Sequence, residues 1–413
     1  MRLTPHNHSP SVLGKIVRSS AREVSFEEAA EALDDLAELT ISSRQTSRIA
    51  QEVGQQLEAQ RDHQVEQLQA RELTPRVETR PALAVVEVDG GRLRIRGEGD
   101  GPGAHDASWR EDKIAMLATA AITVFDADPE PELPACFRDQ KHVEKLVRGI
   151  SGVSSMSPSD PPDERPADAK PTATESPEGL REKPELLVRT YVASTCGSDA
   201  FGPMVAAEAQ SRNFMNARHQ AFVGDGAAWI WKLRQQYFPK FVAIVDFLHV
   251  LGHVFAAAKA AQTGAEERWA LFQAWAEACW KGEVGRVIEA LQALRDGLGP
   301  LSKAEIEGLA DDDPRTILIQ ELGYLENNQK HMDYPRYRQK GLPWTSSHVE
   351  STVKRFNRRV KGTEKSWGED GAEAILQLRA AFLSEDGRLQ DHLKSRPCSS
   401  FRTYKAREDR KVA

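Results

Sequence analysis

Apolar residues recur with helical spacing in residues 345–361 near the C-terminal end of the chain. Ser346 and Ser347 precede this face and can cap a helix N-terminus. A second stripe carries Glu350 in the first turn, followed by cationic side chains that begin with Lys354. The pattern predicts an amphipathic helix. The simplest explanation of these charges is an ion pair between Glu350 and Lys354 on the helix surface, worth ~0.3–0.5 kcal/mol, with neither a metal ion nor a phosphate bound. The apolar face consists of Val349, Val353, Phe356 and Val360.

The N-terminal region has the same helical periodicity in two consecutive segments. After a polar arm, residues 26–39 place their apolar side chains on one stripe, and the pattern breaks near residues 40–41. Ser42 or Ser43 can cap a second helix, which carries Arg44 and Arg48 near its start. Two helices joined by a short turn are typical of a helix-turn-helix DNA reader, although any αα-hairpin has this pattern.

Residues 82–95 change to a strand pattern. We expect a strand that ends at Asp89, a turn at Gly90 and Gly91, and a second alternating strand after it. Residues 109–120 read as a third strand. Asp89 has two interpretations here, because Asp-Gly is a common turn dipeptide as well as a possible metal-ligand position.

The segment 151–185 loses this periodicity and is rich in Pro, Ser, Asp and Glu. Such a composition buries too little apolar surface to offset the cost of ordering, so we expect a disordered acidic loop.

Strands and helices alternate after residue 186, which predicts an α/β fold. We expect a helix at 201–212, a strand ending at Asp225, a helix at 229–237, and a strand at 241–246. Residues 265–330 read as almost entirely helical, with Trp269, Trp275 and Trp280 as core anchors.

A helix that begins near residue 248 carries His249 and His253 at i,i+4, with Asp246 just before it. This spacing resembles a metal-ligand set, but it lacks the glutamate of the H-E-x-x-H motif. We therefore favour histidines that pack against the sheet. The four cysteines form no C-x-x-C pair, so they indicate neither a disulfide framework nor a zinc ribbon.

Composition and charge describe an ordinary globular chain of 413 residues, with 40% hydrophobic and 28% charged residues. No apolar run is long enough to span a bilayer, and no signal sequence is recognisable, so we expect a cytoplasmic protein. The net charge of −7 conceals a basic region: residues 330–361 contain nine Lys or Arg against Asp333 and Glu350. A basic cluster of this kind is the usual electrostatic footprint of a protein that binds nucleic-acid phosphates.

Three acidic residues, Asp89, Asp225 and Glu350, stand at expected strand ends or on the last amphipathic helix. Phosphoryl transfer by two metal ions needs several carboxylates that converge from different elements. Wide separation in sequence is therefore compatible with a common site.

Several motifs in this order are similar to those of bacterial insertion-sequence transposases of the DDE superfamily, in the Kra-type family related to Mutator-like transposases. The resemblance covers about residues 12–385. Its motifs are V-D-G-G at 88–91, S-W-R-E-D-K at 108–113, G-D-G-A-A-W-I-W at 224–231, D-F-L-H-V-L-G-H at 246–253, the run 332–367 with H-V-E-S-T-V-K-R-F-N-R-R at 348–359, and G-A-E-A-I-L-Q-L-R-A at 371–380.

The resemblance implies an RNase H-like catalytic core with an all-helical insertion. Asp89, Asp225 and Glu350 would be the catalytic triad that binds two Mg²⁺ or Mn²⁺ ions. Asp246 and His249 would belong to the D-x-x-H signature after the second acid, where they would support this site or contact DNA. The DNA-binding residues would be Arg44, Arg48, Lys354, Arg355, Arg358, Arg359 and Lys361.

These expectations divide the chain into seven parts. They are a helical N-terminal DNA-binding region (1–78), the first part of the core (79–150), the acidic loop (151–185), the second part of the core (186–262), the helical insertion (263–342), the catalytic helix with the end of the core (343–385), and a basic polar tail (386–413).

The implied activity is metal-dependent cleavage at the element ends and strand transfer into target DNA. The implied partners are DNA and further copies of the chain in a dimer or higher oligomer on DNA, without a membrane or a small-molecule cofactor, in the cytoplasm of a bacterium at the nucleoid. Two alternatives remain: an inactive or truncated transposase-derived DNA-binding protein, and a two-metal nuclease without strand transfer.

Overall fold

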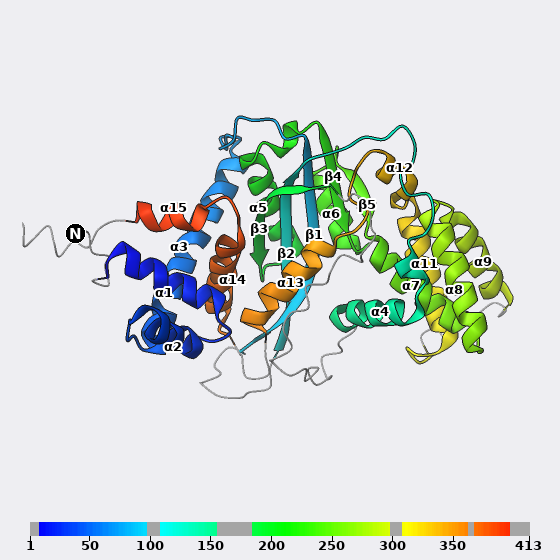
Figure 1. Ribbon diagram of the computed structural model, residues 1–413, viewed down its shortest axis with the longest axis horizontal. Helices are drawn as coiled ribbons and strands as arrows, with labels where there is room; N and C mark the ends of the chain where they lie inside the picture. Colours follow the sequence, from blue (N-terminus) through cyan, green and yellow to red (C-terminus); the bar gives the residue numbers. More distant parts are fainter. Residues whose placement is uncertain (1–7, 97–107, 155–183, 298–307, 362–366, 397–413) are drawn as a thin grey trace, which may run out of the picture.

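A mixed five-stranded sheet forms the centre of the protein, an α/β fold (Figure 1). The computed structural model describes residues 8–96, 108–154, 184–297, 308–361 and 367–396, apart from the side chains of 108, 151–154 and 347–351. The strand order is β3-β2-β1-β4-β5. The strands are β1 (Leu83–Ile95), β2 (Ser108–Ala120), β3 (Leu186–Ser194), β4 (His219–Gly224) and β5 (Val242–Val245).

β1 is one continuous strand, so the predicted turn at Gly90 and Gly91 is wrong. Both glycines pair with β2 in an unbroken antiparallel register, and Asp89 lies in the middle of β1 rather than at its end. The segment expected to be a third strand is therefore β2. The connection between the two strands falls outside the described residues. A glycine pair is compatible with a strand where the neighbouring strand needs the space of a missing side chain.

β2 also pairs antiparallel with β3, whereas β4 and β5 run parallel to β1. The strands predicted to end at Asp225 and Asp246 both occur, and each ends one residue before its aspartate. Their carboxyl ends therefore meet at one end of the sheet.

The two faces of the sheet support two hydrophobic cores. Along β1, Leu83, Val85 and Leu93 contribute to one core, and the alternating residues Ala84 and Val86 contribute to the other. The second core is covered by α5 (Ser198–Ser211) and α6 (Ala228–Tyr237), close to their predicted positions. The first core is covered by α7 (Phe247–Ala261), α13 (Ser347–Val360) and α14 (Glu369–Leu383).

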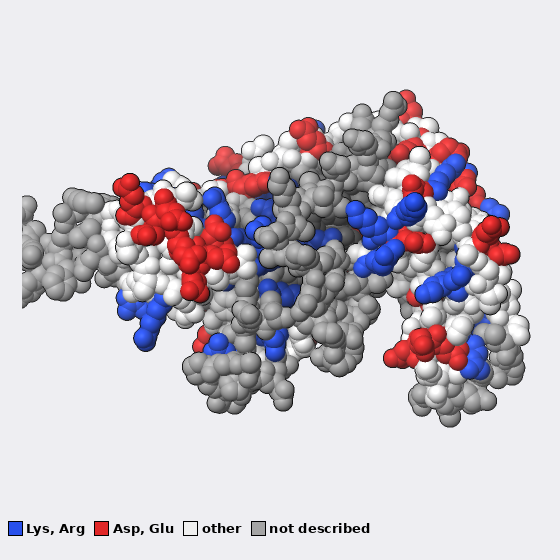
Figure 2. All heavy atoms as spheres, turned by 60° about the horizontal axis from the view of Figure 1, so that its bottom comes forward, with Lys and Arg blue, Asp and Glu red and all other residues white. Residues whose placement is uncertain are grey.

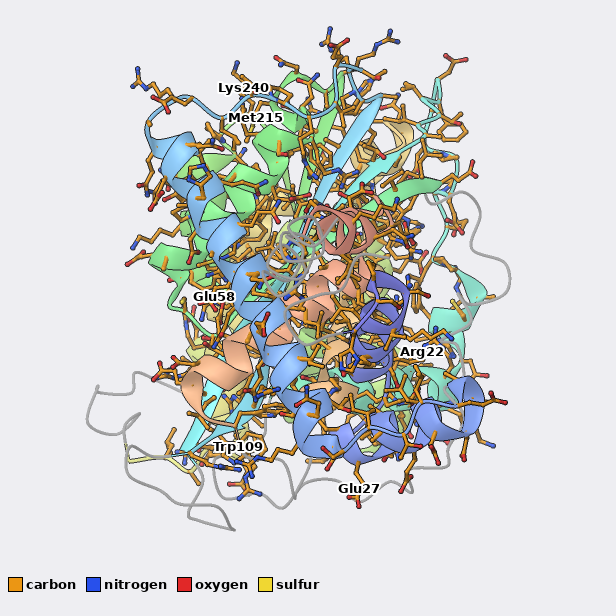
Figure 3. All side chains as sticks on the ribbon, turned by 90° about the vertical axis from the view of Figure 1, so that its left-hand side faces the viewer. Arg22, Glu27, Glu58, Trp109, Met215 and Lys240 are labelled. Atoms are coloured by element: carbon orange, nitrogen blue, oxygen red, sulfur yellow. The ribbon has the colours of Figure 1, made fainter. Side chains whose placement is uncertain are left out.

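The N-terminal region contains three helices: α1 (Pro10–Arg22), α2 (Phe26–Ala37) and α3 (Ser43–Gln69). The predicted helices are present as α2 and α3, with Ser25 and Ser42 as their N-caps. The expectation of a polar arm is wrong from Pro10 onward, because Ser9 caps α1 and Leu13, Ile16 and Val17 are buried. α3 packs along α14 and α5 and so attaches this region to the core, as the side view in Figure 3 shows.

Helices also fill most of residues 263–342, as expected. They are α8 (Ala265–Trp280), α9 (Val284–Gly297), α11 (Pro314–Asn328), the short helix η3 (Gln329–His331) and α12 (Tyr334–Gln339). Trp275 and Trp280 are buried, and Trp269 is partly buried. The α12 hydroxyls of Tyr334 and Tyr337 donate to the carbonyls of Val245 and Ala243, so this block also covers the outer side of β5.

Two boundaries differ from those expected. The helix α4 (Gln140–Ser154), preceded by η1 (Ala135–Arg138), extends into the segment assigned to the acidic loop, and the rest of that loop, 155–183, lies outside the described residues. The expected C-terminal tail begins with helix α15 (Arg388–Ser395), whose Leu389 and Leu393 are buried. A remaining tail segment, 397–413, is also outside the description. None of the described helices is both long and apolar enough to cross a membrane.

Candidate functional site

Three carboxylates follow one another across the sheet at the level where β4 and β5 end, and Asp89 in the middle of β1 is one of them. The register pairs β1 with β4, and β4 with β5, up to the residues that immediately precede Asp89, Asp225 and Asp246. Because adjacent strands lie roughly 4.8 Å apart, this register brings the three aspartates to the same end. We call this group the acidic end of the sheet.

Asp89 lies on the face of the sheet that α13 covers. Asp89 is separated from Val85 and Leu93 by four positions each, so the three residues face the same side of β1. Val85 and Leu93 pack into the same core as Phe356 of α13. The side chain is 7% exposed, and its Oδ1 atom accepts a hydrogen bond of 2.7 Å from the Gly90 amide. The strand therefore fixes this carboxylate between the sheet and the helix that carries Glu350.

Asp225 stands in a turn that the helix α11 supports. Its Oδ1 atom accepts a hydrogen bond of 2.8 Å from the Ala227 amide, and the Tyr324 hydroxyl donates to its backbone carbonyl at 2.7 Å. Gly226 has a φ of +105°, and an added β carbon there would lie 2.6 Å from the Tyr324 ring. Sequence analysis missed Tyr324, because no local pattern connects it to a turn 99 residues away.

Asp246 joins α7 to the start of α13. It is fully buried, its Oδ1 atom caps α7 through the Leu248 amide at 2.9 Å, and its Oδ2 atom accepts a hydrogen bond from Ser346. Ser346 was predicted to cap α13, but its side chain makes no cap bond and turns to Asp246 instead. Nε2 of His249 lies 4.0 Å from Asp246 Oδ2.

The first turn of α13 carries Glu350, which follows Ser346 by four positions. The tie between Ser346 and Asp246 therefore holds the beginning of this helix at the acidic end. Side-chain atoms of Glu350 are outside the described part of the structure, so the expected metal ligand is placed only through its backbone. The face of α13 that was predicted to be apolar contains Val353, Phe356 and Val360, which are all buried.

His253 is not part of this arrangement. Its Nδ1 atom lies 2.5 Å from Glu321 Oε2, and its ring stacks on Tyr324 with centroids 3.4 Å apart. The imidazole thus packs between α7 and α11, which agrees with a structural role for this histidine.

Asp112 is a further buried carboxylate that sequence analysis missed. It lies opposite Gly91 in the β1–β2 register, alternates in phase with core residues on the α13 face, and is fully buried. A β carbon added at Gly91 would lie 2.7 Å from Asp112 Oδ1, so this glycine provides the space for the carboxylate. No other described residue makes a hydrogen bond to either oxygen. Burial raises the pKa of Asp112 to about 7, although its own amide and Lys361 act in the opposite direction.

The cations of α13 divide into two groups. Lys354, Arg355 and Arg358 are exposed, and Lys361 is half-buried. Arg359 is 2% exposed and donates to the carbonyls of Ser20 and Val24 in the N-terminal region. The expectation that Arg359 lies on a DNA-binding surface is therefore wrong, since its guanidinium holds α1 against the core.

The N-terminal helices present a mixed electrostatic surface. Arg44 and Arg48 at the start of α3 are exposed, as a DNA-contacting role requires. The neighbouring α2 exposes only acidic charges, and Glu27 projects away from the body of the protein (Figure 3). In Figure 2, acidic side chains gather over this end of the molecule, whereas Lys and Arg gather near the middle of the same face. The exposed acidic residues of α2 are Glu27, Glu28, Glu31, Asp34 and Asp35, followed by Glu38.

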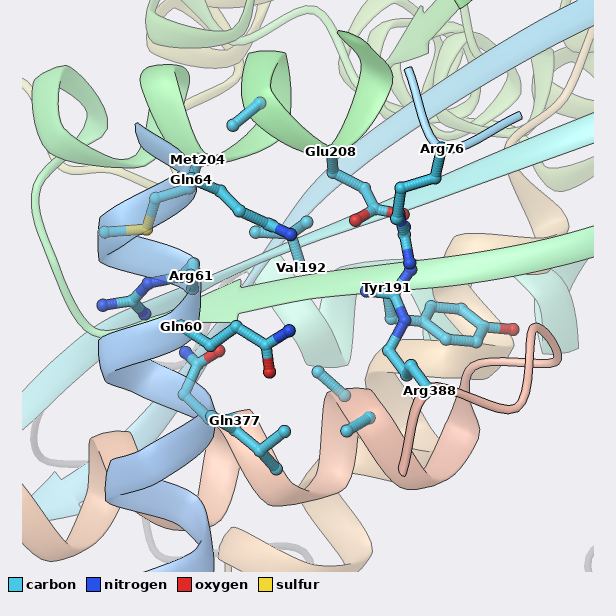
Figure 4. A pocket seen from close by; sticks show the side chains of 14 residues that line it. Gln60, Arg61, Gln64, Arg76, Tyr191, Val192, Met204, Glu208, Gln377 and Arg388 are labelled. Atoms are coloured by element: carbon cyan, nitrogen blue, oxygen red, sulfur yellow. The ribbon is translucent and has the colours of Figure 1, made fainter. Parts of the chain in front are cut away.

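A second group of charged residues surrounds a small cavity between α3, β3, α5 and α14 (Figure 4). Glu208 of α5 lines this cavity, and its Oε1 atom accepts hydrogen bonds from Arg388 at 2.5 Å and Thr190 at 2.8 Å. Arg76 lies 3.5 Å from the same oxygen. Since these cations neutralise Glu208, this group is a structural ion network.

The acidic end provides the ligand chemistry that Mg²⁺ or Mn²⁺ requires, namely carboxylate oxygens. Apart from the amide of Ala227, no described residue makes a hydrogen bond to the Asp225 carboxylate, so its Oδ2 atom has coordination capacity left. Among the described side chains, no three His, Cys, Asp or Glu residues lie close enough to form a metal centre on their own. A complete site therefore needs the Glu350 side chain or oxygens from a substrate.

Comparison with known proteins identified no family model and no curated protein that matches this chain.

Proposed function

We propose that the protein is a DDE-type DNA transposase, which cleaves phosphodiester bonds at the ends of an insertion sequence and transfers the freed end into target DNA. The observation that carries the proposal is the acidic end of the sheet, where Asp89 in β1 and Asp225 directly after β4 occupy neighbouring register positions and the helix that bears Glu350 begins. The mixed sheet, with an antiparallel unit joined to two parallel strands, is compatible with the RNase H-like core that the sequence resemblance implies.

In this proposal, Asp89, Asp225 and Glu350 hold two Mg²⁺ or Mn²⁺ ions. When bound, such ions lower the pKa of a water nucleophile and stabilise the leaving oxygen of the phosphodiester. The chain itself keeps the ligands in place. Gly90 orients the Asp89 carboxylate, and the α11 residue Tyr324 holds the turn of Asp225.

The surroundings of the site supply further positioning and charge. Asp246 ties the first turn of α13 to the sheet, and His249 lies next to it. The exposed cations Lys354, Arg355 and Arg358 follow Glu350 on α13, where they would hold phosphates on either side of the scissile bond. Lys361 and the N-terminal residues Arg44 and Arg48 would extend this contact along the DNA.

Cleavage and strand transfer of DNA that carries the sequences flanking this gene would test the proposal. We expect nicking and joining in Mg²⁺ or Mn²⁺, and loss of both to the limit of detection in Asp225→Asn, because an amide is a poor ligand for these ions. Asp199→Asn is the matched control, since Asp199 is an exposed residue that pairs with Lys232 on α5 and α6. Glu350→Gln should likewise bind DNA without cleaving it.

Three other outcomes would contradict or narrow this proposal. Cleavage that survives in both Asp225→Asn and Glu350→Gln would remove these residues from the site. Cleavage without joining would identify a two-metal nuclease. DNA binding without metal-dependent cleavage by the unmodified protein would identify an inactive transposase-derived DNA-binding protein.

A further inference from the structure

A basic groove runs along the outer side of β5, the edge strand of the sheet. It has a volume of about 250 Å³, and its walls come from α6, β5, η3 and α12. Four cationic side chains line it, together with the carboxylate of Asp333. The cations are Arg234, Lys330, Arg336 and Lys340.

Three of these cations take part in no ion pair among the described residues. Within the described part of the chain, Lys330, Arg336 and Lys340 form no ion pair with a carboxylate. Arg234 donates to the backbone carbonyls of Phe241 and Pro239, which orient its guanidinium without neutralising it. The groove therefore has a strongly positive potential, which favours an anionic ligand.

His331 adds a neutral polar group to the groove. Burial, with help from Lys330 and Arg234, lowers the pKa of His331 to about 4. The ring packs on Trp231 of α6, with centroids 4.7 Å apart. A neutral imidazole at pH 7 can donate a hydrogen bond to a phosphate oxygen without a further counter-charge.

The groove and the acidic end share one set of supporting residues. Trp231, which packs on His331, donates to Asn328 at 2.7 Å. Asn328 donates to the carbonyl of Tyr324, and the Tyr324 hydroxyl donates to the carbonyl of Asp225. Val242 and Ala243 of β5 line the groove, and Asp246 follows the last residue of the same strand, so roughly 10–13 Å of extended chain separates the groove from Asp246.

We propose that this groove binds backbone phosphates of the DNA segment next to the bond held at the acidic end. The inference rests on the proposed function, because it extends the same DNA along the sheet edge. A DNA strand fits better than a small free anion, since Lys330 and Arg336 are exposed and lie along an open groove rather than around a closed cavity.

Chemical acetylation of lysines in the unmodified protein tests directly whether DNA occupies the groove. The reaction is carried out without divalent metal, and the acetylated lysines are identified by mass spectrometry. We expect duplex DNA to protect Lys330 and Lys340 several-fold, while inorganic phosphate at the same phosphate concentration protects neither. Lys232, an exposed lysine paired with Asp199 elsewhere on α6, should acetylate equally in both conditions.

A triple variant, Lys330→Gln, Arg336→Gln and Lys340→Gln, provides the second measurement. The triple variant loses three phosphate contacts. A plot of log K for DNA binding against the logarithm of the salt concentration should therefore become less steep by about 2 to 3. The matched control replaces Arg286, Arg295 and Arg315 with Gln, which removes the same charge from cations that already pair with carboxylates. We expect the control to keep the slope of the unmodified protein.

Equal protection by inorganic phosphate would assign the groove to a free anion and overturn the inference. DNA binding with unprotected lysines and an unchanged slope would overturn it while leaving the proposed function intact. A protein that cleaves DNA normally in the triple variant, with weaker binding, would support both. Failure of the unmodified protein to bind DNA would overturn both.

Discussion

Two regions of the protein bury a carboxylate, and the pKa of the carboxylate is shifted in opposite directions in the two regions. Next to α5, Glu208 is 4% exposed; burial favours a raised pKa, but Arg388 and Arg76 hold the pKa of Glu208 below its ordinary value. On the α13 face, Asp112 is fully buried, no arginine pairs with it among the described residues, and burial raises its pKa to about 7.

The difference is between a buried carboxylate that arginines neutralise and one that no described arginine pairs with. A buried ion pair with its hydrogen bonds satisfied holds helices and strands in one arrangement. On the α13 face, Asp112 has no hydrogen-bond partner among the described side chains, and its burial favours the neutral form. Our proposal places the metal-dependent reaction on the face covered by α13 and gives the network beside Glu208 a structural role.

Removal of the cation at Glu208 should give the largest effect. Arg388→Ala leaves a buried charge without its main partner and should lower the free energy of unfolding by about 3–5 kcal/mol at pH 7. The folded-state pKa of Glu208 is lowered, so its stabilising contribution is present above pH 4.5 and is lost as the pH falls through the folded pKa.

Urea unfolding at pH 7 and pH 4 would measure this effect, and the loss should be smaller at pH 4. Lys232→Ala, which breaks the exposed pair with Asp199, should cost less than about 1 kcal/mol at either pH. An equal loss for both variants would contradict the structural role of the network.

Asp112→Asn tests the other region. The folded-state pKa of Asp112, about 7, is above the ordinary value of 3.8, so the protonated form stabilises the fold below pH 3.8 and this contribution is lost as the pH rises through 7. The unmodified protein should lose on the order of 2–4 kcal/mol between pH 4 and pH 8 from this group. The variant should lack that loss, and parallel pH profiles of the two proteins would contradict the prediction.

Gly91→Ala should disturb the same carboxylate by steric contact. The added β carbon would lie 2.7 Å from Oδ1 and 3.0 Å from Oδ2 of Asp112, which we expect to cost about 1–3 kcal/mol. Calorimetric unfolding would measure the stability of the single variant and of the double variant that also carries Asp112→Gly. We expect the double variant to recover the stability that Gly91→Ala loses. Gly149→Ala on α4, where no atom lies within 4 Å of the added carbon, is the control and should cause no loss.

Tyr324→Phe should give the smallest effect. It removes the hydrogen bond to the Asp225 carbonyl, worth about 1 kcal/mol, and leaves the ring against Gly226. We expect cleavage to slow several-fold in kcat with little change in DNA affinity, because the turn is less well positioned. A change in affinity alone would assign Tyr324 to DNA binding rather than positioning.

Local patterns predicted most of the helices and the parallel strands. Capping serines and apolar spacing placed α2 and α3, and short apolar runs predicted β4 and β5 to end at Asp225 and Asp246, one residue beyond their observed ends. These features depend on neighbours within one or two turns of the chain, which is the range that sequence spacing describes.

The turn prediction at Gly90 and Gly91 failed for a nonlocal reason. A glycine pair is the strongest local signal for a hairpin turn, but here Gly91 faces the Asp112 carboxylate across the ladder. The same limit applies to the cations of α13. Arg358 and Arg359 are adjacent in sequence, yet Arg358 is exposed, whereas Arg359 is buried and donates to the carbonyl of Ser20 in α1.

The sequence by itself determined the alternation of helices and strands, the aspartates that follow β4 and β5, and the basic C-terminal region, because these follow from local spacing and charge. Only the tertiary structure decided which carboxylates share one end of the sheet, which arginines neutralise a buried acid, and which cations remain uncompensated beside β5. Sheet register and helix docking bring together residues up to a hundred or more positions apart, and no local pattern carries that information.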